Sequence, residues 1–376
     1  MKTLNQMLGA NRRLIARVIV LFPIVALALA SAQAGTVTTI ASTIPSNGDL
    51  NPYGVARVPT TTGSLTKGNI LVSNFNNSKN LQGTGTTIVQ ISPGGTVTLF
   101  AQIDANTLPG PCPGGVGLTT ALVALRTGWV IVGSVPTTDG MSDTVQAGCL
   151  LVLDSSGQVV ETFFGSLING PWDMAAFDGG RNVSLFVTNV LNGTVAGGGK
   201  IVHEGTVLRL DLNIPRGSMP NLQQMTVIGA GFAERTDPNA LVIGPTGLAL
   251  SSNDRHPDEG GQVLYVADTL NNRIVAIEDP LQRNTSDGTG MTVFQGGALN
   301  GPLGLEIATN GDILTVNSGD GYLVETKVEG HHGHQVRKVL LDNVNNGAGA
   351  LFGLIDVAGQ GIYFVDDNEN ALNLLH

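Results

Sequence analysis

Two acidic residues interrupt positions that otherwise hold small or apolar side chains. A short turn recurs six times along the chain, and Asp173 stands in a slot that is glycine in the other five copies. Glu306 follows the glycine of the fifth copy by two residues. An acid on a buried strand needs a partner or a metal ion, so both are candidate catalytic and metal-binding residues. The slot glycines are Gly54, Gly117, Gly247, Gly304 and Gly353, and the positions equivalent to Glu306 are Ala56, Thr119, Ala175, Ala249 and Ile355.

Glycine at the slot is expected because it adopts the unusual backbone angles of a tight turn. Asp173 is then either a residue that tolerates the same conformation or a functional departure from a consistent pattern. The residues leave these two alternatives open.

Other oxygen-bearing side chains could join the two acids around a hard cation such as Ca²⁺, which prefers oxygen ligands. Asn189, Asp268 and Asn317 each end the second strand of a repeat and are candidate ligand-binding residues, and the first two are also candidate metal ligands. Turn formation explains such residues too, because Asn, Asp and Ser bond their own backbone, and it is favoured for the whole set. The remaining copies end this strand with Asn74, Ser134 and Asp366.

Only one histidine is expected to lie near a ligand. This is His203, which is next to Glu204 in a long loop at 189–205, and it is a third candidate catalytic residue. A catalytic zinc site usually takes three protein ligands, which one histidine cannot supply. The pattern therefore argues against a zinc-dependent lyase and leaves an oxygen-ligand cation as the alternative.

Aromatic residues precede the turn slot in three copies, as Tyr53, Trp172 and Phe352. Tyr53 and Trp172 are candidate ligand-binding residues, because they could rim an opening and stack on a ligand. Hydrophobic packing between repeats explains them as well and is favoured, because aromatic side chains bury large areas.

The composition favours many short strands joined by tight turns. The chain has 51 glycines among 376 residues, and charged residues make up 13%, about half of the usual share. One well-defined unit reads "GPTGLALSS" (244–252), "QVLYVAD" (262–268), "NRIVAIED" (272–279) and "GMTVFQGG" (290–297). Four antiparallel strands in about 50 residues is the size of one propeller blade.

The same order of strands recurs six times, but the sixth copy lacks its fourth strand. The segment "GTVTTIAS" (35–42) is similar to the fourth strands of other copies. Pairing it with the last repeat would remove an exposed sheet edge. We predict an all-β fold, a six-bladed β-propeller of four-stranded antiparallel blades closed by residues 36–42.

The stretch "GPTGLALSS…QVLYVADTLNNRIVAIED" resembles the NHL repeat, and residues 35–376 are similar to an NHL-type propeller throughout. The resemblance implies the fold rather than one activity, because the family includes protein- and RNA-binding modules, lyases and relatives of metal-dependent lactonases. The diagnostic Glu and Asn-Gly motifs of those lactonases have no counterpart here.

Residues 1–34 have the layout of an export signal. Four basic residues precede an apolar stretch at 18–30, and "AQA" at 32–34 offers a cleavage site near Ala34. We expect a mature domain of residues 35–376 in the periplasm or outside the cell, without a transmembrane segment. In that compartment Cys112 and Cys149 are expected to form a disulfide.

The net negative charge of the mature chain limits the partners that it can bind. The leader removes four of the 19 basic side chains and none of the 29 acidic ones, which leaves a net charge of −14. Such a charge argues against nucleic acid as a partner.

We also expect an ion pair between Arg57 and Asp356, which occupy equivalent positions in neighbouring blades.

Two functions remain open, and the sequence leaves undecided whether the protein is an enzyme. The favoured one is an exported scaffold that binds a protein, a glycan or a small molecule. Long loops at 76–85, 136–148 and 189–205 would wall one side of its ligand-binding face. The alternative is a lactonase-like metal-dependent hydrolase or lyase, with Ca²⁺ or another divalent cation held at the mouth of the axial channel.

Overall fold

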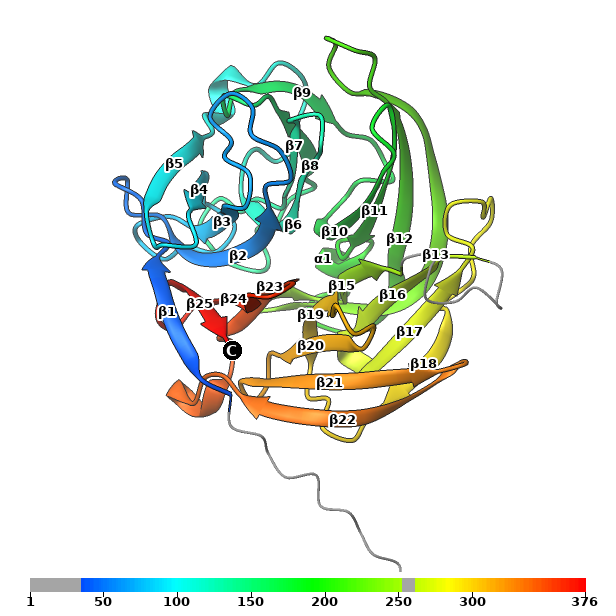
Figure 1. The fold of residues 1–376 in the computed structure, drawn as a ribbon. Helices are drawn as coiled ribbons and strands as arrows, with labels where there is room; N and C mark the ends of the chain where they lie inside the picture. Colours follow the sequence, from blue (N-terminus) through cyan, green and yellow to red (C-terminus); the bar gives the residue numbers. More distant parts are fainter. Residues whose placement is uncertain (1–34, 252–260) are drawn as a thin grey trace, which may run out of the picture. The chain divides into compact units, whose positions relative to one another are not determined.

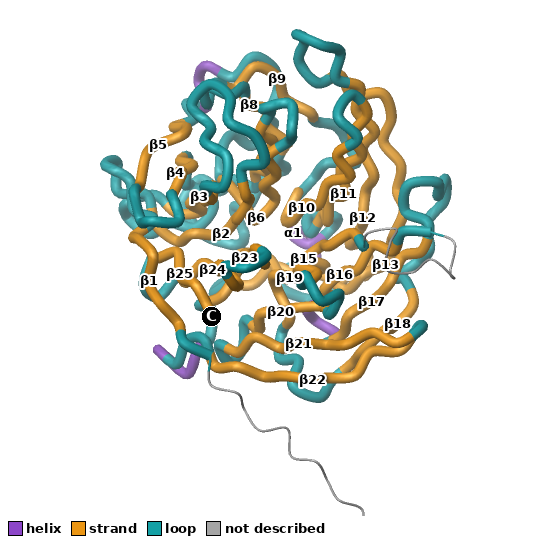
Figure 2. Tube along the Cα trace, viewed as in Figure 1, coloured by secondary structure: helices purple, strands orange, loops and turns teal. Residues whose placement is uncertain are grey.

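The structure, a computed structural model, describes residues 35–251 and 261–376. The predicted signal segment lies outside these residues. The described chain forms six antiparallel sheets around a common axis, which confirms the predicted six-bladed β-propeller (Figure 1). Strands and tight turns make up nearly all of it (Figure 2).

Each sheet begins with its innermost strand and proceeds outwards. The first three blades contain, in order, β2 (Leu50–Arg57), β3 (Ile70–Asn76), β4 (Thr87–Ile91) and β5 (Val97–Gln102); β6 (Leu118–Ala124), β7 (Val130–Ser134), β8 (Cys149–Leu153) and β9 (Val159–Phe163); and β10 (Pro171–Asp178), β11 (Asn182–Asn189), β12 (Val202–Asn213), β13 (Asn221–Asp237) and the short additional strand β14 (Leu241–Ile243).

The other three blades keep the four-stranded pattern. They contain β15 (Pro245–Leu250), β16 (Val263–Asp268), β17 (Arg273–Glu278) and β18 (Met291–Gln295); β19 (Pro302–Ile307), β20 (Ile313–Asn317), β21 (Tyr322–Glu329) and β22 (His332–Leu340); and β23 (Leu351–Val357), β24 (Gly361–Asp366), β25 (Ala371–Leu375) and β1 (Val37–Ser42). The short helical turns are η1 (Ala105–Thr107), α1 (Thr194–Gly197), η3 (Thr269–Asn271) and η4 (Val344–Gly347).

The ring is closed by its two ends, as predicted. Strand β1 pairs antiparallel with β25, from Val37 opposite Leu375 to Ser42 opposite Ala371. Beyond the strand, the backbone N–H of Thr43 donates to the carbonyl of Asn370 at 2.9 Å. The outer edge of β25 is therefore covered by the start of the domain.

Packing between blades forms the core. Every residue of β3, β4, β7 and β8 is buried, because both faces of these strands pack against neighbouring blades. Hydroxyl groups tie successive blades together near the axis by donating to carbonyls of the next blade. These bonds run from Ser73 to Thr119, from Thr119 to Pro171, from Thr188 to Thr246 and from Thr269 to Pro302, at 2.7–3.0 Å.

Four aromatic rings fill the axis at the end where the innermost strands begin. Tyr53 stacks on Phe352 and on Phe75, with ring centroids 3.8 and 4.3 Å apart. Trp172 meets Tyr53 and Phe75 edge to face. We call these four residues the aromatic plug. Tyr53 and Trp172 are each only 2% exposed, so their contact with a ligand stays a prediction, and interblade packing is what the structure shows.

The register of blade two corrects the sequence alignment. In blade one, Ala56 of β2 lies opposite Leu71, whereas in blade two the equivalent residue of β6 is Val123, opposite Ile131. The bulge of β6 contains one residue more than the bulge of β2. The slot residue of blade two is therefore Ala121, and not Gly117, and the position equivalent to Glu306 is Val123, and not Thr119.

The reason for glycine at the slot also differs from the expectation. Gly247 and Gly304 have no left-handed backbone angles. Instead, a Cβ atom on Gly304 would lie 2.0 Å from the carbonyl oxygen of Phe352 in the next blade, and one on Gly247 would lie 2.3 Å from that of Leu303. Close approach of neighbouring strands, rather than turn geometry, requires glycine here.

The predicted disulfide between Cys112 and Cys149 is present and ties the entry to blade two to its third strand. The predicted ion pair of Arg57 with Asp356 is absent from the salt bridges of the described chain. Asp356 instead accepts a hydrogen bond from the backbone N–H of Thr309 at 2.7 Å. No helix in the described part of the chain is long and apolar enough to cross a membrane.

Removing the closing strand is expected to expose the edge of β25. A variant that lacks residues 35–42 should form larger species than the wild type, because unpaired strand edges template association. Size-exclusion chromatography measures this, and a synthetic peptide of residues 35–42 should restore the elution volume of the wild type. A deletion variant that elutes like the wild type and is equally stable would contradict the closure.

Removing the disulfide should lower stability without changing the fold. The bond joins residues 37 apart in sequence, so the double variant Cys112→Ser/Cys149→Ser is expected to lose about 2–4 kcal/mol of unfolding free energy. Chemical denaturation under non-reducing conditions measures the loss. Reduced wild-type protein should match the double variant, and an unchanged denaturation midpoint would contradict the expected contribution.

Candidate functional site

The axial channel contains a cavity of about 290 Å³ that is lined by all six innermost strands. One ring of equivalent side chains, one from each blade, surrounds it. Because strand side chains alternate between faces, this ring lies two residues beyond the slot. Five members are apolar and the sixth is an acid: Ala56, Val123, Ala175, Ala249, Ile355 and Glu306.

Asp173 occupies the slot level next to this ring, where four other blades have no side chain. One carboxylate oxygen accepts the backbone N–H of Met174 at 2.8 Å, and the other accepts that of Leu248 in blade four at 3.3 Å. Its own N–H donates to the hydroxyl of Thr188 at 3.0 Å. The side chain is thereby fixed between blades three and four.

The two acids share one electrostatic environment. Each keeps partial solvent exposure in the channel, yet the surrounding protein desolvates both, and this raises the pKa of Asp173 and that of Glu306 to about 8 each. The carboxyl of Glu306 adds to the effect on the pKa of Asp173, and that of Asp356 adds to the effect on the pKa of Glu306. The two acids singled out by the sequence therefore lie close enough for Glu306 to act electrostatically on Asp173.

The channel cavity lies toward the ends of the innermost strands, where Arg57, Leu125 and Asp178 contribute to its lining. The sequence placed the site at the other end, beside the entry turns, but there the aromatic plug fills the axis. Arg57 is exposed at this mouth, while Asp178 is engaged by Arg126, whose Nε lies 3.6 Å from its carboxylate.

Five of the six polar residues that end the second strands form hydrogen bonds through their side chains. The carboxylate of Asp268 accepts from Nε of Arg273 at 2.5 Å, and the amide of Asn317 donates to the carbonyl of Ala298 and to Asp320, both at 2.8 Å. Asn74, Ser134 and Asp366 also have hydrogen-bond partners. Ligand binding by Asp268 or Asn317 stays a prediction, and it would have to compete with these bonds.

Asn189 is the exception, because neither its amide nitrogen nor its amide oxygen has a partner although the side chain is fully buried. Glu234 on β13 shares this property: its carboxyl is fully buried and both oxygens are without a hydrogen bond of ordinary geometry. Desolvation raises the pKa of Glu234 to about 8, the backbone N–H of Asn192 opposes the rise and the carboxylate of Glu204 adds to it.

Sequence reasoning missed Glu234. The available signal was the length of its strand, because β13 runs from Asn221 to Asp237 and extends well past the other fourth strands. His203, the predicted catalytic histidine, is exposed on β12 beside Glu204. Among the described residues no group of three or more His, Cys, Asp or Glu side chains is placed to hold a metal ion.

Comparison with known proteins shows the fold and no closer relation. No family model matches the chain, and no curated protein matches it significantly. The similar solved structures include a gluconolactonase from Xanthomonas campestris, with 14% identity over 91% of this chain and 89% of that chain and a TM-score of 0.50.

Two further structures are similar to the same extent. The calcium-binding protein regucalcin from Agrobacterium tumefaciens has 12% identity over 89% of this chain and 92% of its own, with a TM-score of 0.54. The aldose sugar dehydrogenase from Streptomyces coelicolor in its PQQ-bound form has 16% identity over 92% and 99%, with a TM-score of 0.51. At these identities the similarity concerns the propeller fold alone.

The buried acids predict a stability that falls as the pH rises. Asp173, Glu234 and Glu306 have folded-state pKa values of about 8, against 3.8 or 4.5 without burial. Between pH 5 and 8 the folded protein therefore binds more protons than the unfolded chain, and its unfolding free energy must decrease. We expect Tm to drop by roughly 5 °C or more over this range in metal-free buffer.

Differential scanning calorimetry with chelator present measures this slope. The triple variant Asp173→Asn/Glu234→Gln/Glu306→Gln should have a much flatter profile, because its amides do not titrate. A wild-type Tm that rises from pH 5 to 8, or a triple variant with the wild-type slope, would show that these carboxyls are not buried as described.

Proposed function

We propose that the protein is a lactonase-like hydrolase that opens small lactones or esters in the axial channel, with Asp173 and Glu306 as its catalytic acids. The observation that carries the proposal is the desolvated carboxyl of Glu306 in a water-accessible cavity whose remaining ring of side chains is apolar, with the desolvated carboxyl of Asp173 at the adjoining level of the channel and within electrostatic reach of it. A cavity of about 290 Å³ lies at the lower end of the range for small-molecule sites, so the substrate is expected to be small.

The two acids also fit a divalent cation. Their donor atoms are carboxylate oxygens, as Ca²⁺ prefers, and each oxygen of Asp173 keeps a lone pair beyond the one hydrogen bond it accepts. No cationic side chain opposes the rise in the pKa of either carboxyl. A cation held by Asp173 and Glu306 would keep both ionised, with water completing its coordination, and it would act as a Lewis acid.

One carboxylate can carry out both proton transfers. Glu306 lines the cavity and is placed to take a proton from an attacking water while the water oxygen bonds to the carbonyl carbon of the substrate. The same proton then passes from Glu306 to the departing alkoxide when the carbon–oxygen ester bond breaks. Asp173, which is held in place by Met174 and Leu248, would keep the cation and the substrate in position beside Glu306.

The same proposal includes the finer assignments made from the sequence. An NHL-type repeat is supported by the match of blade four to the repeat pattern and by its hairpin between β16 and β17. Export of a mature chain of residues 35–376 is supported by the disulfide, since such bonds persist outside the cytosol. Other solved propellers of this fold are a gluconolactonase and a calcium-binding protein by name.

The proposal is tested with purified protein and a panel of small substrates, glucono-δ-lactone, γ-butyrolactone and 4-nitrophenyl acetate, with and without Ca²⁺. Asp173→Asn and Glu306→Gln should each lower kcat/KM by about 100-fold or more, the usual effect of losing a general acid or base. Asp143→Asn, which removes an exposed carboxyl from the 136–148 loop, serves as the matched control and should keep full activity.

Calcium binding is measured separately by isothermal titration calorimetry on the same variants. Loss of binding in Asp173→Asn/Glu306→Gln, but not in Asp143→Asn, would assign the cation to the channel. If no substrate is hydrolysed and no cation binds, the enzyme proposal fails, and the non-catalytic binding scaffold becomes the better account of the fold.

A further inference from the structure

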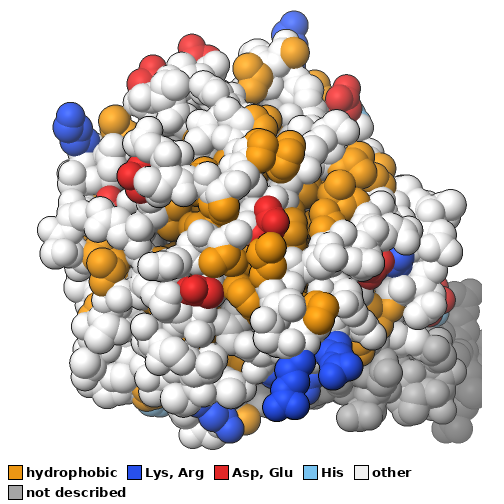
Figure 3. All heavy atoms as spheres, turned by 90° about the horizontal axis from the view of Figure 1, so that it is seen from above, with side chains coloured by type: hydrophobic (Ala, Val, Ile, Leu, Met, Phe, Trp, Pro, Cys, Tyr) orange, Lys and Arg blue, Asp and Glu red, His pale blue; other side chains and the backbone are white. Residues whose placement is uncertain are grey.

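Three arginines form no ion pair with any described residue, namely Arg57, Arg181 and Arg216. The other described arginines each lie within 4.0 Å of a carboxylate. Charged residues make up only 13% of the chain, and on the face in Figure 3 most of the surface is neutral or hydrophobic, with few charged side chains. Arg57 faces the channel, but Arg181 and Arg216 line a second pocket together.

This pocket, of about 520 Å³, lies between the turns of blades two and three. The carbonyl of Arg181 accepts the backbone N–H of Ile214 at 2.7 Å, which fixes the first arginine beside the turn that carries the second. Asp154 also lines the pocket, but its carboxylate accepts bonds from Ser156 and Gln158 of its own turn. Both guanidinium groups are thus exposed and available to a ligand.

Uncompensated guanidinium groups at a pocket point to an anionic ligand. Guanidinium binds carboxylate and phosphate through paired hydrogen bonds, and every described arginine outside this pocket except Arg57 lies within 4.0 Å of a carboxylate of the chain itself. The two free arginines in this pocket have no carboxylate partner within the protein, so a carboxylate of a ligand could take that place.

The other residues that line this pocket favour a ligand with a ring that carries several hydroxyl groups. Trp129 is partly exposed at the pocket, and its ring offers a flat apolar surface for stacking. Hydroxyl groups of Thr127, Ser155 and Ser218 surround it and match the hydroxyls of a sugar as donors and acceptors.

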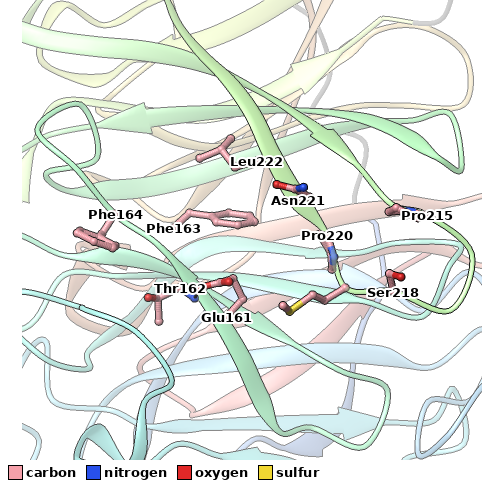
Figure 4. Close-up of a pocket in the computed structure, with 10 residues that line it drawn as sticks. Glu161, Thr162, Phe163, Phe164, Pro215, Ser218, Pro220, Asn221 and Leu222 are labelled. Atoms are coloured by element: carbon pink, nitrogen blue, oxygen red, sulfur yellow. Dashed lines mark hydrogen bonds between the residues drawn. The ribbon is translucent and has the colours of Figure 1, made fainter.

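A second pocket of about 620 Å³ continues from the first, because Pro215 and Ser218 line both. In Figure 4 the ring of Phe163 points into this space toward Asn221, and Phe164 lies at its far end. Phe164 is 44% exposed. The two pockets adjoin at the turn that carries Pro215 and Ser218, and we treat them as one groove, with the arginines at one end and Phe163, Phe164 and the carboxyl of Glu161 at the other.

We propose that this groove binds an acidic oligosaccharide, with a uronate carboxylate between Arg181 and Arg216, its ring on Trp129, and further sugar units running toward Phe163. The groove is separate from the channel residues Asp173 and Glu306. The site can therefore be tested whether or not the protein hydrolyses lactones.

The experiment is isothermal titration calorimetry of the full mature chain with trigalacturonate. Its methyl ester, which keeps the rings but lacks the charges, should bind about tenfold or more weakly, since a hydrogen bond to a charged group contributes about 1.5–3 kcal/mol. Arg181→Gln and Arg216→Gln should each lose a similar factor. Both side chains are exposed and unpaired, so the variants should fold normally, which their thermal melts will check.

Lys79→Gln is the matched control, because it removes one exposed cation from the 76–85 loop, distant from the groove, and should bind like the wild type. Three results would overturn the proposal: no binding of trigalacturonate at millimolar concentration, equal binding of the methyl ester, or equal loss in Lys79→Gln. Equally tight binding of a short poly-glutamate peptide would also overturn it, because it would identify an acidic peptide site instead.

Discussion

The close approach of the innermost strands around the axis is the constraint on which the rest of the structure depends. A Cβ on Gly304 would lie 2.0 Å from a carbonyl oxygen of the next blade, so any larger residue at that slot would push two blades apart. At Gly247 and Gly304 neighbouring blades approach so closely that the slot has to remain without a side chain. The closing pair of β1 and β25 then holds the ring at that spacing.

The same constraint explains why the channel acids are informative. Blade three accommodates Asp173 at the slot because its carboxylate bridges to the backbone N–H of Leu248, so the gap between two blades is filled by a polar contact rather than left empty. Glu306 stands one ring further along among apolar neighbours. Both acids are desolvated by the packing that forms the propeller, so the same feature that builds the fold also raises the pKa of these two carboxyls.

Polar groups are distributed unevenly over the two ends of the axis. At one end the aromatic plug and the hydroxyl-to-carbonyl bonds between blades exclude water and make a rigid base. At the other end the strands diverge, the cavity admits solvent, and the turns of blades two and three carry the free arginines. A rigid frame with variable turns at one end is how propellers generally separate folding from recognition.

The sequence by itself determined the number of blades, the strand order, the closure by residues 36–42, the disulfide and the two acids that depart from the repeat. These follow from local patterns, because alternation, turn residues and repeat period are written along the chain.

Only the tertiary structure decided the features that depend on contacts between blades. The extra residue in the bulge of β6 moved the slot from Gly117 to Ala121, the aromatic plug put the cavity at the opposite end of the channel, and Asp356 bonded to Thr309 rather than to Arg57. The unpartnered Glu234 and the free Arg181 and Arg216 were equally invisible. Whether a polar group has a partner is set by residues distant in sequence, and that information exists only once the blades have packed.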